Sequence, residues 1–340
     1  MSKHIEHKKP CIPPDQKDVT QTEVLNTLQG KHLYSFNYDH GEDTLCILES
    51  KYLFDQEPTD KLLVSDKKMP PSISPFIKSR LDITVTSENY TEFIGTIKKK
   101  GIQQEGFKVE YLVLKGDETG YNQRLSKLKD IGYRIEGFPD YYYPTKTYGI
   151  GYFHGKWCFG ELIKSTYSRD THKQKLHSYS NSINISIAKS LVNIASKGDT
   201  SKKLLDACCG VGTILLEACY SGFQIEGCDI NRKICNDARA NLELYGYQTK
   251  VHHSDIGQIT EKYDAAILDL PYNLFSTATD SDILHILQSS LKIAPHLVIV
   301  SIADISEQLN AAQLRIVDHC NVQKTRKRNF TRKVWVCKKS

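Results

Sequence analysis

The chain contains 340 residues, of which 39% are hydrophobic and 25% are charged, and its formal net charge is +5. This composition is typical of a globular protein with about two domains, and no apolar run approaches the length of a membrane span. The small basic excess excludes a histone-like protein but is compatible with a polyanion-binding surface. The ten cysteines include no pair with C-x-x-C spacing, so we expect reduced thiols and no metal site. We expect a cytoplasmic protein with no membrane partner.

The N-terminal half shows the pattern of a separate α+β domain. Residues 1–14 are polar and lack the apolar stretch of a secretory signal, so we expect a flexible tail. Over 15–165, short aromatic and β-branched runs surround one helical stretch, which favours an α+β domain. The polar stretch 166–180 is the expected linker. The runs lie at 33–38, 44–48, 107–114, 148–153 and 156–159, and the helical stretch lies at 123–131.

The C-terminal part, 181–340, alternates short apolar runs with amphipathic stretches. Such alternation is typical of successive βα units, which form a parallel sheet. We therefore predict an α/β domain of the doubly wound, Rossmann-like type with a mostly parallel seven-stranded sheet. The expected strands are 203–206, 224–229, 250–253, 263–269 and 296–302, with an antiparallel ribbon at 315–319 and 332–337, and the expected helices are 182–196, 212–221, 232–245 and 281–291.

A glycine-containing turn connects the first of these strands to the helix that follows it. Gly210 and Gly212 let the backbone approach a ligand where a Cβ atom would not fit. The N-terminus of the next helix points its free N–H groups at the polar end of that ligand. Asp206, at the end of the strand, can hold an ammonium group or an ordered water molecule there.

Two further acids follow the next strands in chain order. Asp229 ends the second strand, where a nucleotide-binding α/β fold places the acid that binds ribose hydroxyls. Asp255 follows the third strand and can accept from an adenine amino group, with Ile256 flanking the ring. Taken alone, Asp255 is better explained as a helix cap, and Asp229 fits either a helix cap or a ligand contact. The order of the two acids after the glycine loop favours a ligand site. Leu215 stands at the third glycine position of G-x-G-x-x-G, which disfavours a dinucleotide dehydrogenase.

The segment 269–272 follows the fourth strand, at the carboxyl edge where open α/β sheets bind ligands. An exocyclic amine on a base is a poor nucleophile because its lone pair is delocalised into the ring. The Asp269 carboxylate and the Leu270 carbonyl, left free by Pro271, can accept both amine hydrogens and localise that lone pair. Tyr272 can then stack on the base. The same four residues also suit an ordinary strand-ending turn, so the functional interpretation depends on the ligand-binding pattern that precedes them.

Taken together, these motifs resemble a known class of enzyme. The segments D-A-C-C-G-V-G-T, G-C-D-I-N and D-L-P-Y resemble class I methyltransferases that modify nucleic-acid amines, whose usual forms are D-P-x-C-G-x-G-T and [DN]-P-P-Y. Ala207 and Leu270 stand where that class has proline. The whole arrangement is similar to the THUMP-containing tRNA guanine-N2-methyltransferases, which act on the guanosine at tRNA position ten. The resemblance is strong over 176–340 and includes the N-F-T-R-K-V segment at 329–334, whereas 132–135, 144–150 and 156–160 resemble a diverged THUMP-type half.

The resemblance implies S-adenosylmethionine as the cofactor and RNA, with tRNA expected, as the partner. It also implies a THUMP-like domain that grips the RNA. The catalytic residues would be Asp269, Leu270, Pro271 and Tyr272. The cofactor would be bound by Asp206, Cys209, Gly210, Gly212, Thr213, Asp229, Ile230, Asp255 and Ile256.

Basic residues near the C-terminus form the expected RNA surface, because phosphate binding uses such clusters. They are Lys324, Arg326, Lys327, Arg328, Arg332 and Lys333. The run 98–100 is better explained as a solvated face.

Two alternatives stay open from the sequence. The tetrapeptide also fits an amine methyltransferase acting on ribosomal RNA guanine, on DNA adenine or cytosine, or on protein glutamine. The chain could also be a non-catalytic RNA-binding protein with a degenerate methyltransferase fold. The oligomeric state is left undetermined by the sequence.

Overall fold

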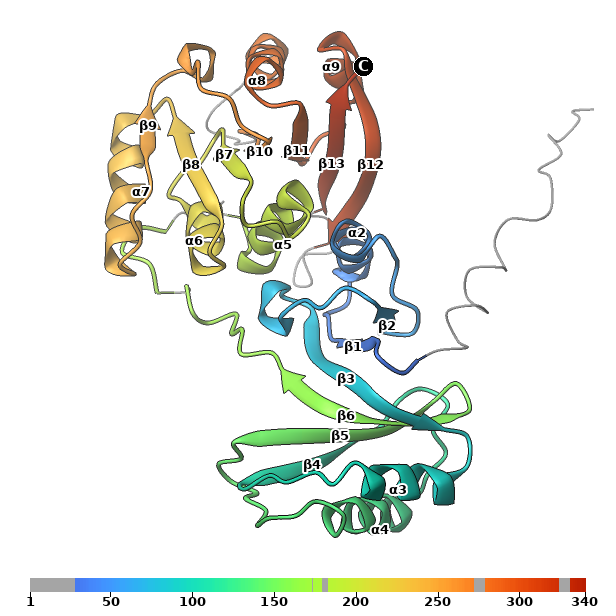
Figure 1. Ribbon diagram of the computed structural model, residues 1–340. Helices are drawn as coiled ribbons and strands as arrows, with labels where there is room; N and C mark the ends of the chain where they lie inside the picture. Colours follow the sequence, from blue (N-terminus) through green and yellow to red (C-terminus); the bar gives the residue numbers. More distant parts are fainter. Residues whose placement is uncertain (1–27, 173, 179–182, 272–278, 324–330) are drawn as a thin grey trace, which may run out of the picture. The chain divides into compact units, whose positions relative to one another are not determined.

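The computed structural model describes residues 28–172, 174–178, 183–271, 279–323 and 331–340, and it divides into two compact units (Figure 1). Unit 1 contains the described residues up to His32 together with Leu81–Glu161. Unit 2 contains Leu33–Arg80 together with Leu162–Ser340, so unit 2 is discontinuous along the chain. The expected tail, 1–14, lies outside the described residues.

Seven strands form a single sheet in unit 2: β7 (Lys203–Asp206), β8 (Gln224–Asp229), β9 (Val251–His253), β10 (Ala265–Asp269), β11 (His296–Ser301), β12 (Leu314–Gln323) and β13 (Thr331–Lys339). Their order is β12-β13-β11-β10-β7-β8-β9. The pairs from β11 to β9 are parallel, whereas β13 is antiparallel to β11 and to β12. The predicted mostly parallel, doubly wound sheet is therefore confirmed.

Helices cover both faces of this sheet because its central strands are apolar on both sides. On β10, Ile267 packs in one core with α5, α6 and α7, and the neighbouring Leu268 packs in another core with α8 and α9. Side chains that follow each other along a strand point to opposite faces, so each face buries every second residue. The helices are α5 (Ile185–Ser196), α6 (Thr213–Tyr220), α7 (Arg232–Leu244), α8 (Asp280–Ile293) and α9 (Ser306–Ala311), with the 3-10 turn η2 (Ile256–Gln258).

The N-terminal part of unit 2 differs from the sequence expectation in two ways. The run 44–48, taken as extended from its composition, lies in helix α2, where Leu45, Leu48 and Leu53 are buried. These leucines share one core with α5 and β12. By their contacts, residues 33–80 group with the α/β sheet, although their strands belong to the same six-stranded sheet as the strands between 77 and 164. The elements here are β1 (His32–Phe36), α2 (Asp43–Phe54), β2 (Leu62–Ser65) and η1 (Pro71–Ile73).

Unit 1 is an α+β structure, as predicted for much of the N-terminal half. Helices α3 and α4 share a core with its strands, centred on Phe93, Ile131 and Phe159. The backbones of two strands approach each other closely at Gly160. A Cβ atom there would lie 1.8 Å from the Asp82 carbonyl oxygen, so only glycine fits. Its elements are β3 (Ile77–Ser87), α3 (Tyr90–Lys99), β4 (Phe107–Leu112), α4 (Tyr121–Gly132), β5 (Lys146–Phe153) and β6 (Lys156–Lys164), with β4 parallel and β6 antiparallel to β5.

The nine cysteines among the described residues are all free thiols. No helix in the described part of the chain is long and apolar enough to span a membrane.

A buried glutamate lies where α2 meets α5 and makes the stability of unit 2 depend on pH. Glu49 accepts hydrogen bonds from Ser74 Oγ at 2.5 Å and from Asn193 Nδ2 at 2.6 Å. Burial raises the pKa of Glu49 to about 7, against the lowering effect of these two donors. A carboxyl whose pKa is higher in the folded than in the unfolded state binds more protons when folded, so stability falls as pH rises between the two values.

We expect the Glu49→Gln variant to lose part of this pH dependence, because an amide keeps the buried geometry without an ionisable proton. Thermal unfolding of wild type should shift to lower temperature as pH rises from the usual glutamate pKa through about 7, and the variant should shift less. Glu57→Gln, at an exposed position, is the control. Identical slopes in all three proteins would contradict the assignment.

Candidate active site

The predicted glycine loop connects β7 to α6. Gly210 and Gly212 have φ angles of 52° and 81°, in the left-handed region that favours glycine. The Gly210 N–H donates to Asp229 Oδ2 at 3.1 Å, which ties the loop to the end of β8. Gly212 is the N-cap of α6, so the unpaired N–H groups of the first helical turn face the loop. The loop is thus a backbone cradle suited to the polar end of a ligand.

Gly227 on β8 is a further glycine that the sequence analysis did not single out. A Cβ atom at this position would lie 2.7 Å from Leu215 Cδ1, closer than two carbon atoms can pack. The glycine lets β8 approach the loop closely. Glycine is required at this position because two strand–helix connections pack together here. The local sequence does not indicate this requirement.

Asp206 at the end of β7 is the most unusual side chain of the site. It is 0% exposed, and neither carboxylate oxygen has a hydrogen-bond partner of good geometry among the described residues, although the nearby Cys208 N–H acts to lower its pKa. Burial, followed by the charges of Asp269 and Asp229, raises its pKa well above the ordinary value. Three acids thus meet at the carboxyl ends of neighbouring strands, and the charges of Asp269 and Asp229 disfavour ionisation of Asp206 until a cation is present. A buried acid without a partner is costly, so this arrangement favours a cationic ligand.

Asp229 is held by backbone groups and still has acceptor capacity. Its Oδ1 accepts from the Asn231 N–H at 2.8 Å, and its Oδ2 accepts from the Gly210 N–H. Each carboxylate oxygen has two lone pairs, so both oxygens can accept a further bond from a ligand hydroxyl. The cap-like contacts and the predicted ribose contact are thus compatible.

Asp255 is a cap with a partner that the sequence did not reveal. Its Oδ1 accepts from the Gly257 N–H at 2.7 Å and lies 2.8 Å from His285 Nε2. The hydrogen bond from His285 is the main cause that lowers the pKa of Asp255. Because both bonds use Oδ1, Oδ2 is the oxygen that can bind a ligand amine. His285 lies on α8, far along the chain, so spacing gave no signal for the pair.

The other predicted cofactor residues differ in how far their side chains are exposed to solvent. The side chains of Cys209, Thr213 and Ile256 are buried in the absence of a ligand. Ile230 is 72% exposed, which is unusual for a large apolar side chain beside a cluster of acids. It is available to pack against an apolar part of a ligand.

The predicted catalytic segment begins at the end of β10, between β7 and β11 in the sheet. Asp269 pairs in register with Val300 of β11. The Leu270 N–H donates to the Val300 carbonyl at 3.1 Å, and the Leu270 side chain is buried, which fixes the backbone at this point. Pro271 follows, is exposed, and has no N–H group. Tyr272 lies outside the described residues.

The structure corrects part of the predicted basic surface. Arg332 on β13 is only 4% exposed, so its guanidinium is placed in the interior rather than on an RNA-binding face. Lys333 pairs with Asp304 at 2.6 Å and lies over the Trp335 ring. In register it faces Ser301, at the same edge of the sheet as Asp269. Lys324, Arg326, Lys327 and Arg328 lie outside the described residues.

A second cluster of acids on unit 2 is neutralised by the protein itself. Glu226, His252 and Glu261 each bring one donor atom within 4.8 Å of the others. Lys203 Nζ lies 3.2 Å from both glutamates, and the Tyr263 hydroxyl donates to Glu226 at 2.8 Å. These contacts explain the cluster as an ion-pair network.

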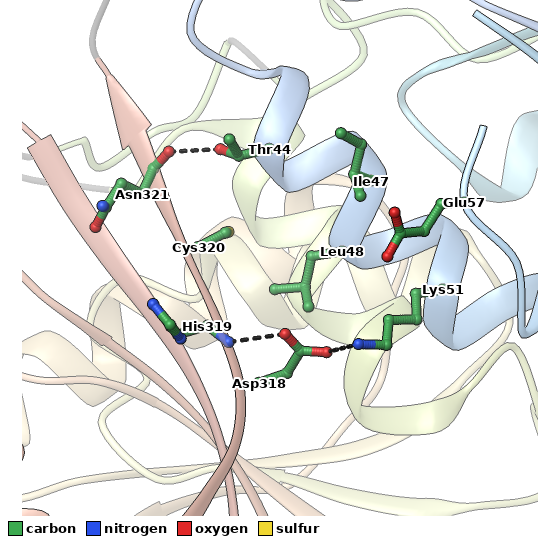
Figure 2. A pocket seen from close by; sticks show the side chains of 9 residues that line it. All are labelled: Thr44, Ile47, Leu48, Lys51, Glu57, Asp318, His319, Cys320 and Asn321. Atoms are coloured by element: carbon green, nitrogen blue, oxygen red, sulfur yellow. Dashed lines mark hydrogen bonds and ion pairs between the residues drawn. The ribbon is translucent and has the colours of Figure 1, made fainter. Parts of the chain in front are cut away.

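A pocket with a volume of about 330 Å³ lies between α2 and β12, and Figure 2 shows the side chains that line it. Lys51 Nζ pairs there with Asp318, and Thr44 Oγ1 donates to the Asn321 carbonyl at 2.6 Å. None of its lining residues belongs to the glycine loop or to the acids at the strand ends. It is lined by Thr44, Ile47, Leu48, Lys51, Glu57, Asp318, His319, Cys320 and Asn321.

The segment that carries the predicted motifs matches a known family. Residues 173–294 match the UPF0020 family, described as an RMKL-like methyltransferase domain. The match includes Asp206, Asp229 and Asp269. Unit 2 therefore contains a methyltransferase domain.

Two curated proteins are similar to the chain over part of their length. The tRNA (guanine(10)-N2)-dimethyltransferase of Methanothermobacter thermautotrophicus is 35% identical over 101 residues, which cover 28% of this chain and 29% of that protein. The enzyme of the same name from Methanocaldococcus jannaschii is 34% identical over 116 residues, which cover 30% of this chain and 32% of that protein. The chain thus matches less than a third of each relative's length. Among solved structures, TrmN from Thermus thermophilus aligns over 91% of this chain and all of its own, with 13% identity and a TM-score of 0.47.

Proposed function

We propose that the protein is an S-adenosylmethionine-dependent RNA methyltransferase that methylates the exocyclic N2 amine of a guanosine in tRNA. The observation that carries this proposal is the fully buried Asp206 carboxylate, which has no hydrogen-bond partner among the described residues and lies beside two more acids. A ligand with a positively charged group satisfies this site. The methyltransferase family match over 173–294 and the two tRNA-modifying relatives support the choice of cofactor and substrate.

The residues of the cradle fit S-adenosylmethionine. Asp206 would bind its ammonium group, and Asp229 would bind the ribose hydroxyls through the acceptor capacity left on both oxygens. Asp255 would accept from the adenine amino group through Oδ2, with Ile230 and Ile256 beside the ring. The cofactor supplies a methyl group activated by its sulfonium charge.

The edge beside β10 fits a planar amine. The Asp269 carboxylate and the Leu270 carbonyl would accept the two amine hydrogens, so that the nitrogen lone pair turns toward the methyl group. Little general-base strength is needed, because the methylated amine loses its proton readily. The residues act mainly by positioning and by placing negative charge near a cationic centre. Tyr272, which follows Pro271, is proposed to stack on the base.

The RNA is proposed to contact parts of both units. Unit 1 would serve as a THUMP-like RNA-binding domain, in line with the resemblance of 132–135, 144–150 and 156–160. On unit 2, Lys333 and the basic run that precedes β13 would contact phosphates, and binding should then weaken with salt. A cytoplasmic location is part of this proposal. The basic run comprises Lys324, Arg326, Lys327 and Arg328.

The decisive test of substrate is a comparison of four acceptors with the full-length protein. We expect methyl-labelled S-adenosylmethionine to label a tRNA fraction, and nucleoside mass spectrometry to identify N2-methylguanosine or N2,N2-dimethylguanosine. Ribosomal RNA, DNA and protein fractions serve as the alternatives. Label confined to one of these would overturn tRNA as the substrate, and the absence of cofactor binding would leave a non-catalytic RNA-binding protein.

A further inference from the structure

The segment expected to be a linker is fixed against the methyltransferase domain. We call its described residues, 167–172 and 174–178, the strap. His172 Nδ1 lies 2.6 Å from Glu217 on α6, and both side chains are buried. Asn241 on α7 accepts from the His177 N–H at 3.0 Å and donates to the His177 carbonyl at 2.9 Å. The strap therefore has a defined position across α6 and α7.

This position places a lysine at the N-terminus of α6, beside the glycine loop. Lys175 Nζ donates to Thr213 Oγ1 at 2.6 Å, and Thr213 is the first residue of the helix. The ammonium is partly buried, and no carboxylate of a described residue lies within ion-pair distance of it. Glu217, the acid that influences it, is engaged by His172.

A cation at this end of a helix is electrostatically unfavourable. The N-terminus of a helix carries a partial positive charge, and cations are stabilising only near the C-terminus. At the C-terminal end of α6 the neighbouring helix α5 supplies such a cation: Lys189 Nζ donates to Ser221 Oγ, at the C-cap of α6, at 2.6 Å. Burial lowers the pKa of Lys175 to about 8, which indicates that its charge is poorly compensated. Burial lowers the pKa of Lys189 to about 8 as well, so the two lysines differ in the end of α6 that they contact and not in their pKa.

The two ends of the loop favour ligand groups of opposite charge. At one end, the buried Asp206 has no hydrogen-bond partner among the described residues and requires a cation. At the other end, the Lys175 ammonium and the free N–H groups of α6 require an anion. An amino-acid group carries an ammonium and a carboxylate on the same carbon atom. A single ligand with such a group can therefore bind at both ends of the loop.

We propose that Lys175, together with Thr213 and the first N–H groups of α6, binds the methionine carboxylate of S-adenosylmethionine. The proposal rests on the cofactor assignment made above for the same loop. It extends that site to the strap, so that the segment entering the methyltransferase domain becomes part of its cofactor pocket. Lys175 is a binding residue here and takes no part in the chemistry.

The test compares two ligands that differ only in the carboxylate. Calorimetry is performed with S-adenosylmethionine and with decarboxylated S-adenosylmethionine, which keeps the ammonium and the sulfonium. Lys175→Met should weaken S-adenosylmethionine by about 10- to 100-fold, the usual effect of losing a hydrogen bond to a charged group. Its affinity for the decarboxylated ligand should stay at the wild-type value. Lys175→Arg, which keeps the charge, should retain most of the preference of wild type for the carboxylated ligand.

Lys189→Met is the matched control, because it removes a buried lysine of α5 that contacts the opposite end of α6. It should lower the thermal stability without changing the ratio of the two affinities. Equal weakening of both ligands by Lys175→Met, or no weakening of either, would overturn the proposal. Wild-type protein that binds neither ligand would instead refute the cofactor assignment itself.

Discussion

Replacing Asp269 with alanine is expected to abolish methyl transfer while cofactor binding persists. The substitution removes one of the two acceptors that would orient the amine, together with negative charge next to the reacting centre. Losing one positioned electrostatic group typically costs about 10²- to 10³-fold in turnover, and the loss of orientation adds to this. Turnover is measured on tRNA at saturating cofactor, and cofactor affinity is measured by calorimetry.

Asp264→Ala provides a matched control on the same stretch of chain. Asp264 directly precedes β10, at the opposite end of the strand, where its Oδ2 accepts from the Lys203 N–H at 2.8 Å. Turnover per folded molecule should be retained in this variant. Unchanged turnover in Asp269→Ala would remove Asp269 from the mechanism, and a parallel loss of cofactor binding would assign it to the cofactor site instead.

Binding of S-adenosylmethionine is expected to release a proton from Asp206. Burial and the charges of Asp269 and Asp229 raise the pKa of this acid in the free protein, whereas an ammonium partner favours the ionised form. Affinity should therefore increase with pH until pH exceeds the raised value. Calorimetry in buffers of different ionisation enthalpy counts the released protons.

Asp206→Asn should remove this proton release and weaken the cofactor by about 10- to 100-fold, because the charged hydrogen bond is lost. Asp255→Asn is the control, since hydrogen bonding to His285 lowers the pKa of Asp255 and keeps it ionised without ligand. That variant should release as many protons as wild type. Binding by wild type without proton release would show that Asp206 is already ionised or lies outside the cofactor site.

The sheet and its acids could be predicted because both depend on local patterns. Runs such as 265–269 are apolar on both faces, which is typical of central parallel strands. The carboxyl ends of such strands meet at one edge, so Asp206, Asp229 and Asp269 could be expected together. The structure places Asp206 on β7, which pairs in parallel with β8, the strand of Asp229, on one side and with β10, the strand of Asp269, on the other.

Contacts between distant parts of the chain could not be predicted in this way. The run 44–48 has the composition of a strand but forms a helix, because α2 buries its leucines against α5 and β12. Arg332 follows a basic run in the sequence and is buried in the sheet. The partners of Lys175 and His285 could not be found from spacing, since they lie 38 and 30 positions away in sequence and meet these residues only through tertiary packing.

The split arrangement of unit 2 determines how a minimal catalytic fragment has to be designed. A truncation that starts at 181 would remove α2 and uncover the apolar side chains of α5 and β12 that it shields. An internal excision of 81–161 keeps both pieces of unit 2. The Ser165 N–H donates to the Lys78 carbonyl at 3.0 Å, so the two cut ends are neighbours and a short glycine-rich bridge can join them. The larger piece of unit 1, Leu81–Glu161, thus lies along the chain between the two pieces of unit 2.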